Sequence, residues 1–115
     1  MEIKLLVLRT PDPEKLATFY RLLGCSFEHH QHGKGPWHYA TTIGTTTLEI
    51  YPLTKSQNEA DKNLRLGFAI NNFETVLATL QQHHFQISGS PQQTDFGYMA
   101  VVQDSDGRKI ELYRK

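Results

Sequence analysis

Hydrophobic and polar positions follow two different periods in the first half of the chain. Leu6 and Leu8 alternate with their neighbours as in a strand, and the segment Thr10-Pro11-Asp12-Pro13 ends it. The following stretch has helical spacing: Asp12 can cap a helix, Pro13 suits its first turn and Gly24 offers an exit, with one apolar face formed by Leu16, Phe19, Tyr20 and Leu23. The pattern then predicts three strands, near residues 26–31, 37–43 and 46–51.

The same order of signals returns about 60 residues later. A strand is predicted at 64–70, a helix capped by Asn72 follows, and three strands are predicted near 86–88, 98–103 and 109–113. The offset between equivalent residues is nearly constant, since Leu66 minus Leu6 is 60 and Glu111 minus Glu49 is 62. The sequence therefore predicts an α+β fold in which a single domain, 1–115, contains two tandem βαβββ modules at about 1–57 and 62–115.

A four-stranded sheet with one helix leaves its second face bare, so neither module is expected to be stable alone. We expect each helix to cover the convex face of its curved mixed sheet, while the two concave faces enclose a cleft that binds a ligand. Because alternate strand residues share a face, Glu49 and Glu111 should point into this cleft. The apolar residues next to them should point the other way.

Composition limits the partners of the protein. Lys plus Arg and Asp plus Glu number 12 each, so neither nucleic acid nor an anionic membrane is an expected partner. The one cysteine, Cys25, cannot form an internal disulfide, and no apolar run reaches the roughly 20 residues of a membrane span. The N-terminal segment is charged and alternating, unlike a signal peptide. We expect a reduced, cytoplasmic protein.

Three segments resemble one known family. They are Phe19-Tyr20-Arg21-Leu22-Leu23-Gly24, Leu48-Glu49-Ile50-Tyr51 and Asp104-Ser105-Asp106-Gly107-Arg108-Lys109-Ile110-Glu111-Leu112, and together they are typical of the glyoxalase/bleomycin-resistance/extradiol-dioxygenase (vicinal oxygen chelate) superfamily. The resemblance covers essentially the whole chain and implies the same fold. Relatives commonly assemble as dimers, so a homodimer is expected.

The resemblance also bears on metal binding. Metal-dependent relatives carry one ligand on the first and last strand of each module, and the matching positions here are Leu5, Glu49, Arg65 and Glu111. Leucine has no donor atom, and a guanidinium stays protonated and repels a cation. Neither a metal nor another cofactor is therefore expected at these positions.

The expected cleft offers several candidate site residues. Arg65 should meet Glu49 and Glu111 in a salt-bridged cluster, which either replaces the metal structurally or contacts a ligand. Strand alternation leaves open whether His38 or Tyr39 faces the cleft. The remaining expected ligand-binding residues are Arg9, Tyr51 and Tyr113.

A run of histidines, at positions 29, 30, 32 and 38, suggests a metal site at first sight. Adjacent strand residues point to opposite faces, so His29 and His30 cannot share an ion, and His32 leads into a Gly-Pro turn. A site built only from these histidines is therefore not expected.

Three functions remain in view, and the first is favoured. It is a metal-independent protein that binds a small polar or aromatic molecule without turning it over. The alternative is a lyase or isomerase of the same superfamily, with or without metal assistance, in which Glu49 or Glu111 acts as a general base with His38, Tyr39 or Arg65 in support. A structural or regulatory subunit is a third reading, and it predicts a cleft filled by side chains.

Overall fold

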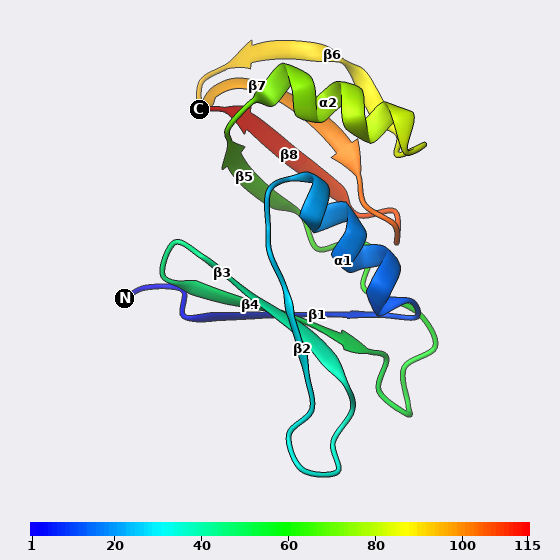
Figure 1. The fold of residues 1–115 in the computed structure, drawn as a ribbon. Helices are drawn as coiled ribbons and strands as arrows, with labels where there is room; N and C mark the ends of the chain where they lie inside the picture. The colour runs from blue at the N-terminus through cyan, green and yellow to red at the C-terminus, as the bar shows by residue number, and fades with distance from the viewer. The chain divides into compact units, whose positions relative to one another are not determined.

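Two four-stranded mixed sheets, each with one helix, make up the protein in a computed structural model that describes residues 1–115 (Figure 1). The first unit comprises Met1–Arg21 and Cys25–Ala60, and the second comprises Leu22–Gly24 and Asp61–Lys115. The elements of the first βαβββ module are β1 (Leu5–Thr10), α1 (Pro13–Leu22), β2 (Glu28–His30), β3 (His38–Ile43) and β4 (Thr46–Pro52). Those of the second are β5 (Leu66–Ile70), α2 (Phe73–Gln82), β6 (Ile87–Thr94), β7 (Gly97–Gln103) and β8 (Lys109–Arg114). The predicted tandem α+β architecture is confirmed.

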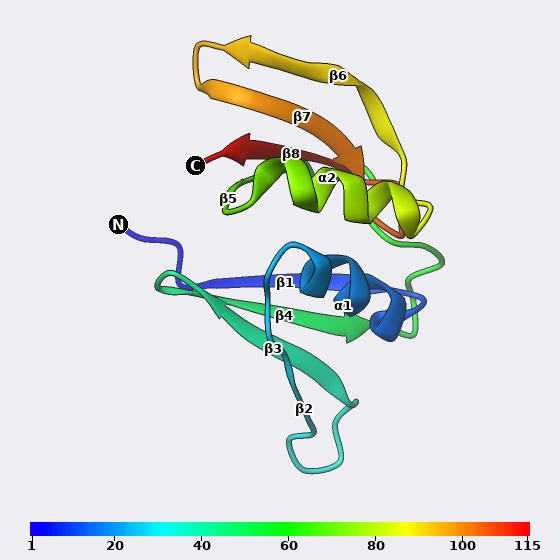
Figure 2. The ribbon, with the colours of Figure 1, turned by 45° about the horizontal axis from the view of Figure 1, so that its top comes forward.

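The sheet of the N-terminal unit has the strand order β1-β4-β3-β2, with β1 parallel to β4 and the other pairs antiparallel (Figure 2). Glu49 lies opposite Val7 on β1 and Ala40 on β3, and directly paired residues share a face. We call this side the Glu49 face. The other side carries the buried residues Leu8, Leu48 and Ile50.

Helix α1 covers the side of this sheet opposite the Glu49 face. The hydroxyl of Tyr39 on β3 donates to the carboxylate of Glu14 on α1, and the Arg21 guanidinium lies 5.4 Å from the centre of the Tyr39 ring. The predicted alternation in β4 is therefore correct: apolar side chains point toward the helix, and Glu49 points away from it.

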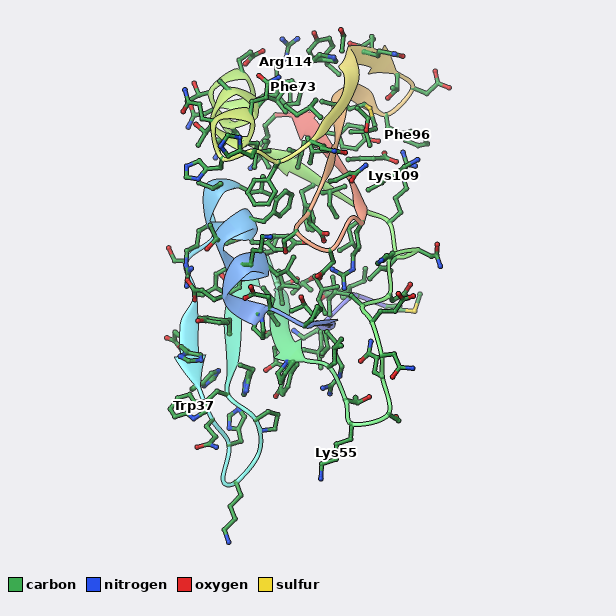
Figure 3. The ribbon with its side chains drawn as sticks, turned by 90° about the vertical axis from the view of Figure 1, so that its right-hand side faces the viewer. Trp37, Lys55, Phe73, Phe96, Lys109 and Arg114 are labelled. Carbon is green, nitrogen blue, oxygen red and sulfur yellow. The ribbon has the colours of Figure 1, made fainter.

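The C-terminal unit repeats the arrangement with the order β5-β8-β7-β6. Glu111 lies opposite Gly67 and Val101, which defines the Glu111 face, while Ile110 and Leu112 on the other side are fully buried. Helix α2 lies on that buried side. The ring centroids of Phe73 and Tyr98 are 5.7 Å apart, and Arg114 of β8 donates to Glu74 of α2. Figure 3 labels Phe73 and Arg114.

Both helices start where the sequence predicts, but only α1 has the expected side-chain cap. Asp12 Oδ1 accepts the backbone N–H of Lys15 at 3.1 Å, and α1 begins at Pro13. Asn72 was expected to cap α2 with its side chain, and this is wrong: its backbone is left-handed, with φ 55°, and its side chain makes no cap hydrogen bond. Asparagine tolerates this conformation, so its role is to turn the chain between β5 and α2.

Strand β6 is longer than predicted. It runs from Ile87 to Thr94, and its pairing with β7 is interrupted by an irregularity between Ser88 and Gln92. The Gly-Ser-Pro segment inside it reads as a break in the sequence, whereas the structure accommodates it as a bulge.

A buried charge cluster shapes the turn before β8. Arg108 is 1% exposed and pairs with Asp104 at 3.1 Å and Asp106 at 2.7 Å, and it also donates to the backbone carbonyl of Asp61 at 2.9 Å. Burial raises the pKa of Asp104 in spite of the adjacent guanidinium. The cluster therefore carries a desolvation cost, and it connects the turn to the start of the C-terminal unit.

We predict that Arg108→Met destabilises the fold by about 3–5 kcal/mol, because it leaves two buried carboxylates without their cation. Arg114→Met is the matched control, since Arg114 and Glu74 form a solvent-exposed pair, with side chains 51% and 69% exposed, and such pairs contribute little to stability. Urea unfolding of both variants measures the difference. Equal midpoints would contradict a structural role for Arg108.

Candidate functional site

Three side chains form a stacked row across the Glu49 face. We call Arg9, Tyr51 and His38 the aromatic row. The Tyr51 and His38 rings are parallel within 9° at a centroid distance of 4.2 Å, and the Arg9 guanidinium lies 5.0 Å from the Tyr51 centroid. Because β4 lies between β1 and β3, the Tyr51 ring separates the arginine from the histidine. The row thus fixes the orientation of the His38 ring.

His38 stands next to the carboxylate of Glu49. The His38 Nε2 and Glu49 Oε2 atoms are 3.5 Å apart, His38 is 1% exposed, and the Glu49 side chain is 18% exposed. On the other side of the ring, Nδ1 lies 3.3 Å from the Pro36 carbonyl oxygen. Since a carbonyl oxygen only accepts, a hydrogen bond at this contact uses an Nδ1 proton, and Nε2 is the atom that faces the carboxylate.

The structure resolves the choice between His38 and Tyr39. His38 lies on the Glu49 face, while Tyr39 lies on the helix side, where its hydroxyl binds Glu14 and its ring stacks on His29 at 4.3 Å. The hydrogen bond to Glu14 raises the pKa of Tyr39. Tyr39 was expected among the ligand-binding residues, and its position on the helix side separates it from Glu49 and His38.

A polar hollow adjoins Glu49 on β2, β3 and β4. Its volume is ≈ 340 Å³, and its lining consists of Ser26, Glu28, Ala40, Thr41, Thr42 and Thr47. Ala40 is the β3 partner of Glu49 in the sheet register. Because hydroxyl groups both donate and accept hydrogen bonds, the hollow suits a ligand with polar groups better than an apolar one.

In the C-terminal unit the carboxylate of Glu111 is held on both oxygens. Arg65 Nε donates to Oε2 at 2.6 Å, and the Tyr113 hydroxyl donates to Oε1 at 2.5 Å. The Tyr113 hydrogen bond and, after it, Arg65 lower the pKa of Glu111. Arg65 therefore contacts Glu111 as the sequence suggests, whereas a cluster that also includes Glu49 stays a prediction.

The family's metal positions do not fit a metal in this chain. Leu5 lies opposite Thr47 on the Glu49 face and offers no donor atom. Arg65 is a cation already paired with Glu111. The aligned set thus lacks two of its four ligands.

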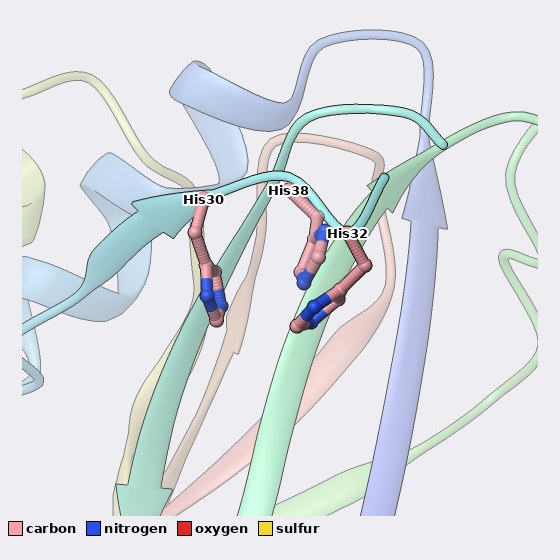
Figure 4. A group of neighbouring side chains, drawn as sticks. All are labelled: His30, His32 and His38. Atoms are coloured by element: carbon pink, nitrogen blue, oxygen red, sulfur yellow. The ribbon is translucent and has the colours of Figure 1, made fainter. Parts of the chain in front are cut away.

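The histidines are arranged differently from the expectation. His29 points to the helix side, as alternation requires, but His30, His32 and His38 lie together, with their ligand nitrogens all within 4.8 Å of one another (Figure 4). The segment after β2 folds back through a turn closed by the Gly35 N–H and the His32 carbonyl. Strand alternation correctly predicts that His29 and His30 lie on opposite sides of the sheet. It does not predict that the chain after β2 folds back and brings His32 to His30 and His38.

Cys25 and Tyr98 belong to none of the groups described above. Burial raises the pKa of the Cys25 thiol, which opposes a nucleophilic role. Tyr98 is half-buried and packs on Phe73 of α2. No helix of the structure has both the length and the apolar character that crossing a membrane requires.

Comparison with known proteins identifies the family. The model of the Glyoxalase/Bleomycin resistance protein/Dioxygenase superfamily matches residues 2–112. A search of curated proteins found no match.

Solved structures share the fold at low identity. Hypothetical protein SA1046 from S. aureus is 19% identical with a TM-score of 0.73, over 100% of this chain and 97% of that one. TnmS3, an antibiotic binding protein from Streptomyces sp. CB03234, is 22% identical with a TM-score of 0.74, over 99% and 95%. Oxidase ChaP-H2 is 14% identical with a TM-score of 0.78, over 100% and 94%. Since the family model spans nearly every residue and the fold agrees, the chain belongs to the Glyoxalase/Bleomycin resistance protein/Dioxygenase superfamily.

Proposed function

We propose that the protein binds a small polar or aromatic molecule on the Glu49 face of its N-terminal unit. The observation that carries this proposal is the placement of the Glu49 carboxylate beside both the aromatic row and the polar hollow. A carboxylate accepts hydrogen bonds from a ligand, and the threonine hydroxyls of the hollow can donate or accept. The ligand would therefore carry donor groups.

The exposure of neighbouring side chains supports the same face. Leu5 and Val7 on β1 are 54% and 37% exposed, although both are apolar, and Val7 lies directly opposite Glu49 while Leu5 lies opposite Thr47. Exposed apolar side chains beside a fixed charge are typical of a binding surface rather than of a structural sheet face. This combination suits a ligand with one apolar part and one polar part.

The relatives are compatible with this class of function. TnmS3 is described as an antibiotic binding protein, which is an instance of the same fold used for binding. Binding of this kind requires a shaped surface and no catalytic group. The surface of the Glu49 face meets that requirement.

The alternative of a lyase or isomerase depends on which glutamate could act as a base. Glu111 is a poor candidate, because its lowered pKa makes it a weak base at neutral pH and both its oxygens already accept hydrogen bonds. Glu49 is the better candidate, since it has only His38 beside it and adjoins the hollow. In this reading Glu49 takes a proton and His38 orients it.

We predict that Glu49→Gln weakens ligand binding about 10-fold or more, because a hydrogen bond to a charged group is worth about 1.5–3 kcal/mol. The probe is a panel of antibiotics and small polar aromatic compounds, screened by methyl NMR. Ligands should shift the methyl groups of Val7, Thr42 and Thr47.

The matched control is Glu14→Gln, which removes a glutamate on the helix side of the same sheet. It should leave the affinity of any ligand unchanged. Shifts confined to Leu48 and Ile50, or no ligand at all from the panel, would count against the Glu49 face. Turnover of a ligand that is lost in Glu49→Gln would favour the enzyme alternative.

We also predict that Tyr113→Phe raises the pKa of Glu111 toward its ordinary value, because the largest stabilising hydrogen bond of the carboxylate is removed. Since the folded pKa is lowered, the stability that Glu111 contributes is present above its ordinary pKa and is lost as the pH falls through the lowered value. Tyr113→Phe should reduce this loss. Carboxyl carbon NMR titration measures the pKa, with Tyr98→Phe as the control, and an unchanged Glu111 titration in Tyr113→Phe would refute the assignment.

A further inference from the structure

The β2–β3 hairpin brings three imidazole rings to one place. His30 ends β2, His38 begins β3, and the two are direct partners in the register, while His32 returns toward them from the connecting loop. The ring centroids are 4.5 Å apart for His30 and His38 and 5.0 Å apart for the two pairs that include His32. We call these three residues the histidine cluster, and Figure 4 shows their rings on the same side of the sheet.

Two nitrogens of the histidine cluster are buried without a hydrogen-bond partner. They are the Nε2 atoms of His30 and His38, and the His38 side chain is 1% exposed. A buried polar atom that lacks a partner costs about 1–3 kcal/mol, and native proteins rarely retain such atoms without a reason. The Glu49 carboxylate oxygen lies 3.5 Å from His38 Nε2, which is long for a hydrogen bond, so these nitrogens are suited to a group from outside the chain.

The surroundings of His38 indicate the charge of that group. Nδ1 lies 3.3 Å from the Pro36 carbonyl oxygen, and a Glu49 carboxylate oxygen lies 3.5 Å from Nε2. A carboxylate beside the imidazole favours a cation at this place. A metal ion would bind all three imidazoles at once.

We propose that His30, His32 and His38 form a binding site for one divalent transition-metal ion of the zinc class. Three histidines with one open position are a known arrangement for zinc, and imidazole is a preferred ligand of this class of metal. Tetrahedral geometry with Zn–N bonds of 2.0–2.1 Å places ligand nitrogens about 3.4 Å apart. The ligand nitrogens of the histidine cluster lie within 4.8 Å of one another, so they must approach by at most about 1.4 Å to bind one ion.

The hairpin can provide this closure. His38 is held by the Tyr51 stack and the Pro36 carbonyl, so it orients the site as a second-layer hydrogen bond orients a ligand histidine. His32 is exposed and lies outside any strand, so its ring can move toward the other two. The fourth position then lies beside Glu49, which adds negative charge next to the ion.

This site differs from the ligand positions shared by the metal-dependent relatives, and it goes beyond the proposed function. Its donors come from β2, β3 and their loop, and not from the first strand of either sheet. His32 belongs neither to the aromatic row nor to the hollow. A variant of His32 therefore tests the metal site without removing the proposed ligand site.

The experiment is zinc titration by calorimetry and chelator competition, on the chain without an affinity tag. We expect one Zn²⁺ per chain with a Kd of about 1 µM or tighter. His32→Ala should weaken binding about 100-fold or more, since removing a ligand exceeds the 10–100-fold cost of removing an outer partner. His29→Ala is the matched control, because His29 lies in the same hairpin but points to the helix side.

A second measurement reads the ligands directly. Imidazole nitrogen NMR should show Zn²⁺ on Nε2 of His38 with Nδ1 still protonated, and Co²⁺ should give the visible absorption of a tetrahedral site. Equal affinity in His32→Ala and His29→Ala, or binding of more than one weak equivalent, would overturn the proposal. Because His32 is exposed, circular dichroism should show that His32→Ala remains folded, so that a loss of zinc affinity reports on the site.

Discussion

The parallel pairing of the first and last strand in each unit is the constraint from which the rest of the structure follows. Parallel neighbours cannot be joined by a tight turn, so the chain must leave the sheet and return, and in both units it does so through a helix and two further strands. The helix occupies one face, and the apolar residues of β4 and β8 point toward that side. The carboxylates of Glu49 and Glu111 are thereby directed to the other face, opposite Val7 and Gly67.

The two units share this frame but have different chemistry on it. Glu111 is saturated by Arg65 and Tyr113, and its pKa is lowered. Glu49 faces a histidine whose Nε2 has no hydrogen-bond partner and adjoins a polar hollow. The duplicated backbone therefore places one engaged and one available carboxylate at equivalent positions.

Buried charge has a structural role elsewhere in the molecule. Arg108 lies under the turn that precedes β8, and its two aspartates and the Asp61 carbonyl hold that turn in one conformation. Burial raises the pKa of Asp104 in spite of its pairing, so the cluster carries a desolvation cost. Its contacts connect the turn before β8 with the backbone of Asp61.

Periodicity alone determined the order of elements, the doubled βαβββ plan, the cap at Asp12 and the faces of Glu49 and Glu111, because each of these depends on residues close together in the chain. The tertiary structure decided what depends on distant residues. The β3–β4 register places His38, and not Tyr39, on the Glu49 face. The loop after β2 places His32 next to His30, and packing buries Arg108. Asn72 has a left-handed backbone and does not make the expected side-chain cap hydrogen bond to α2. Local spacing predicts which side a strand residue faces, but only contacts across the chain determine which side chains meet there.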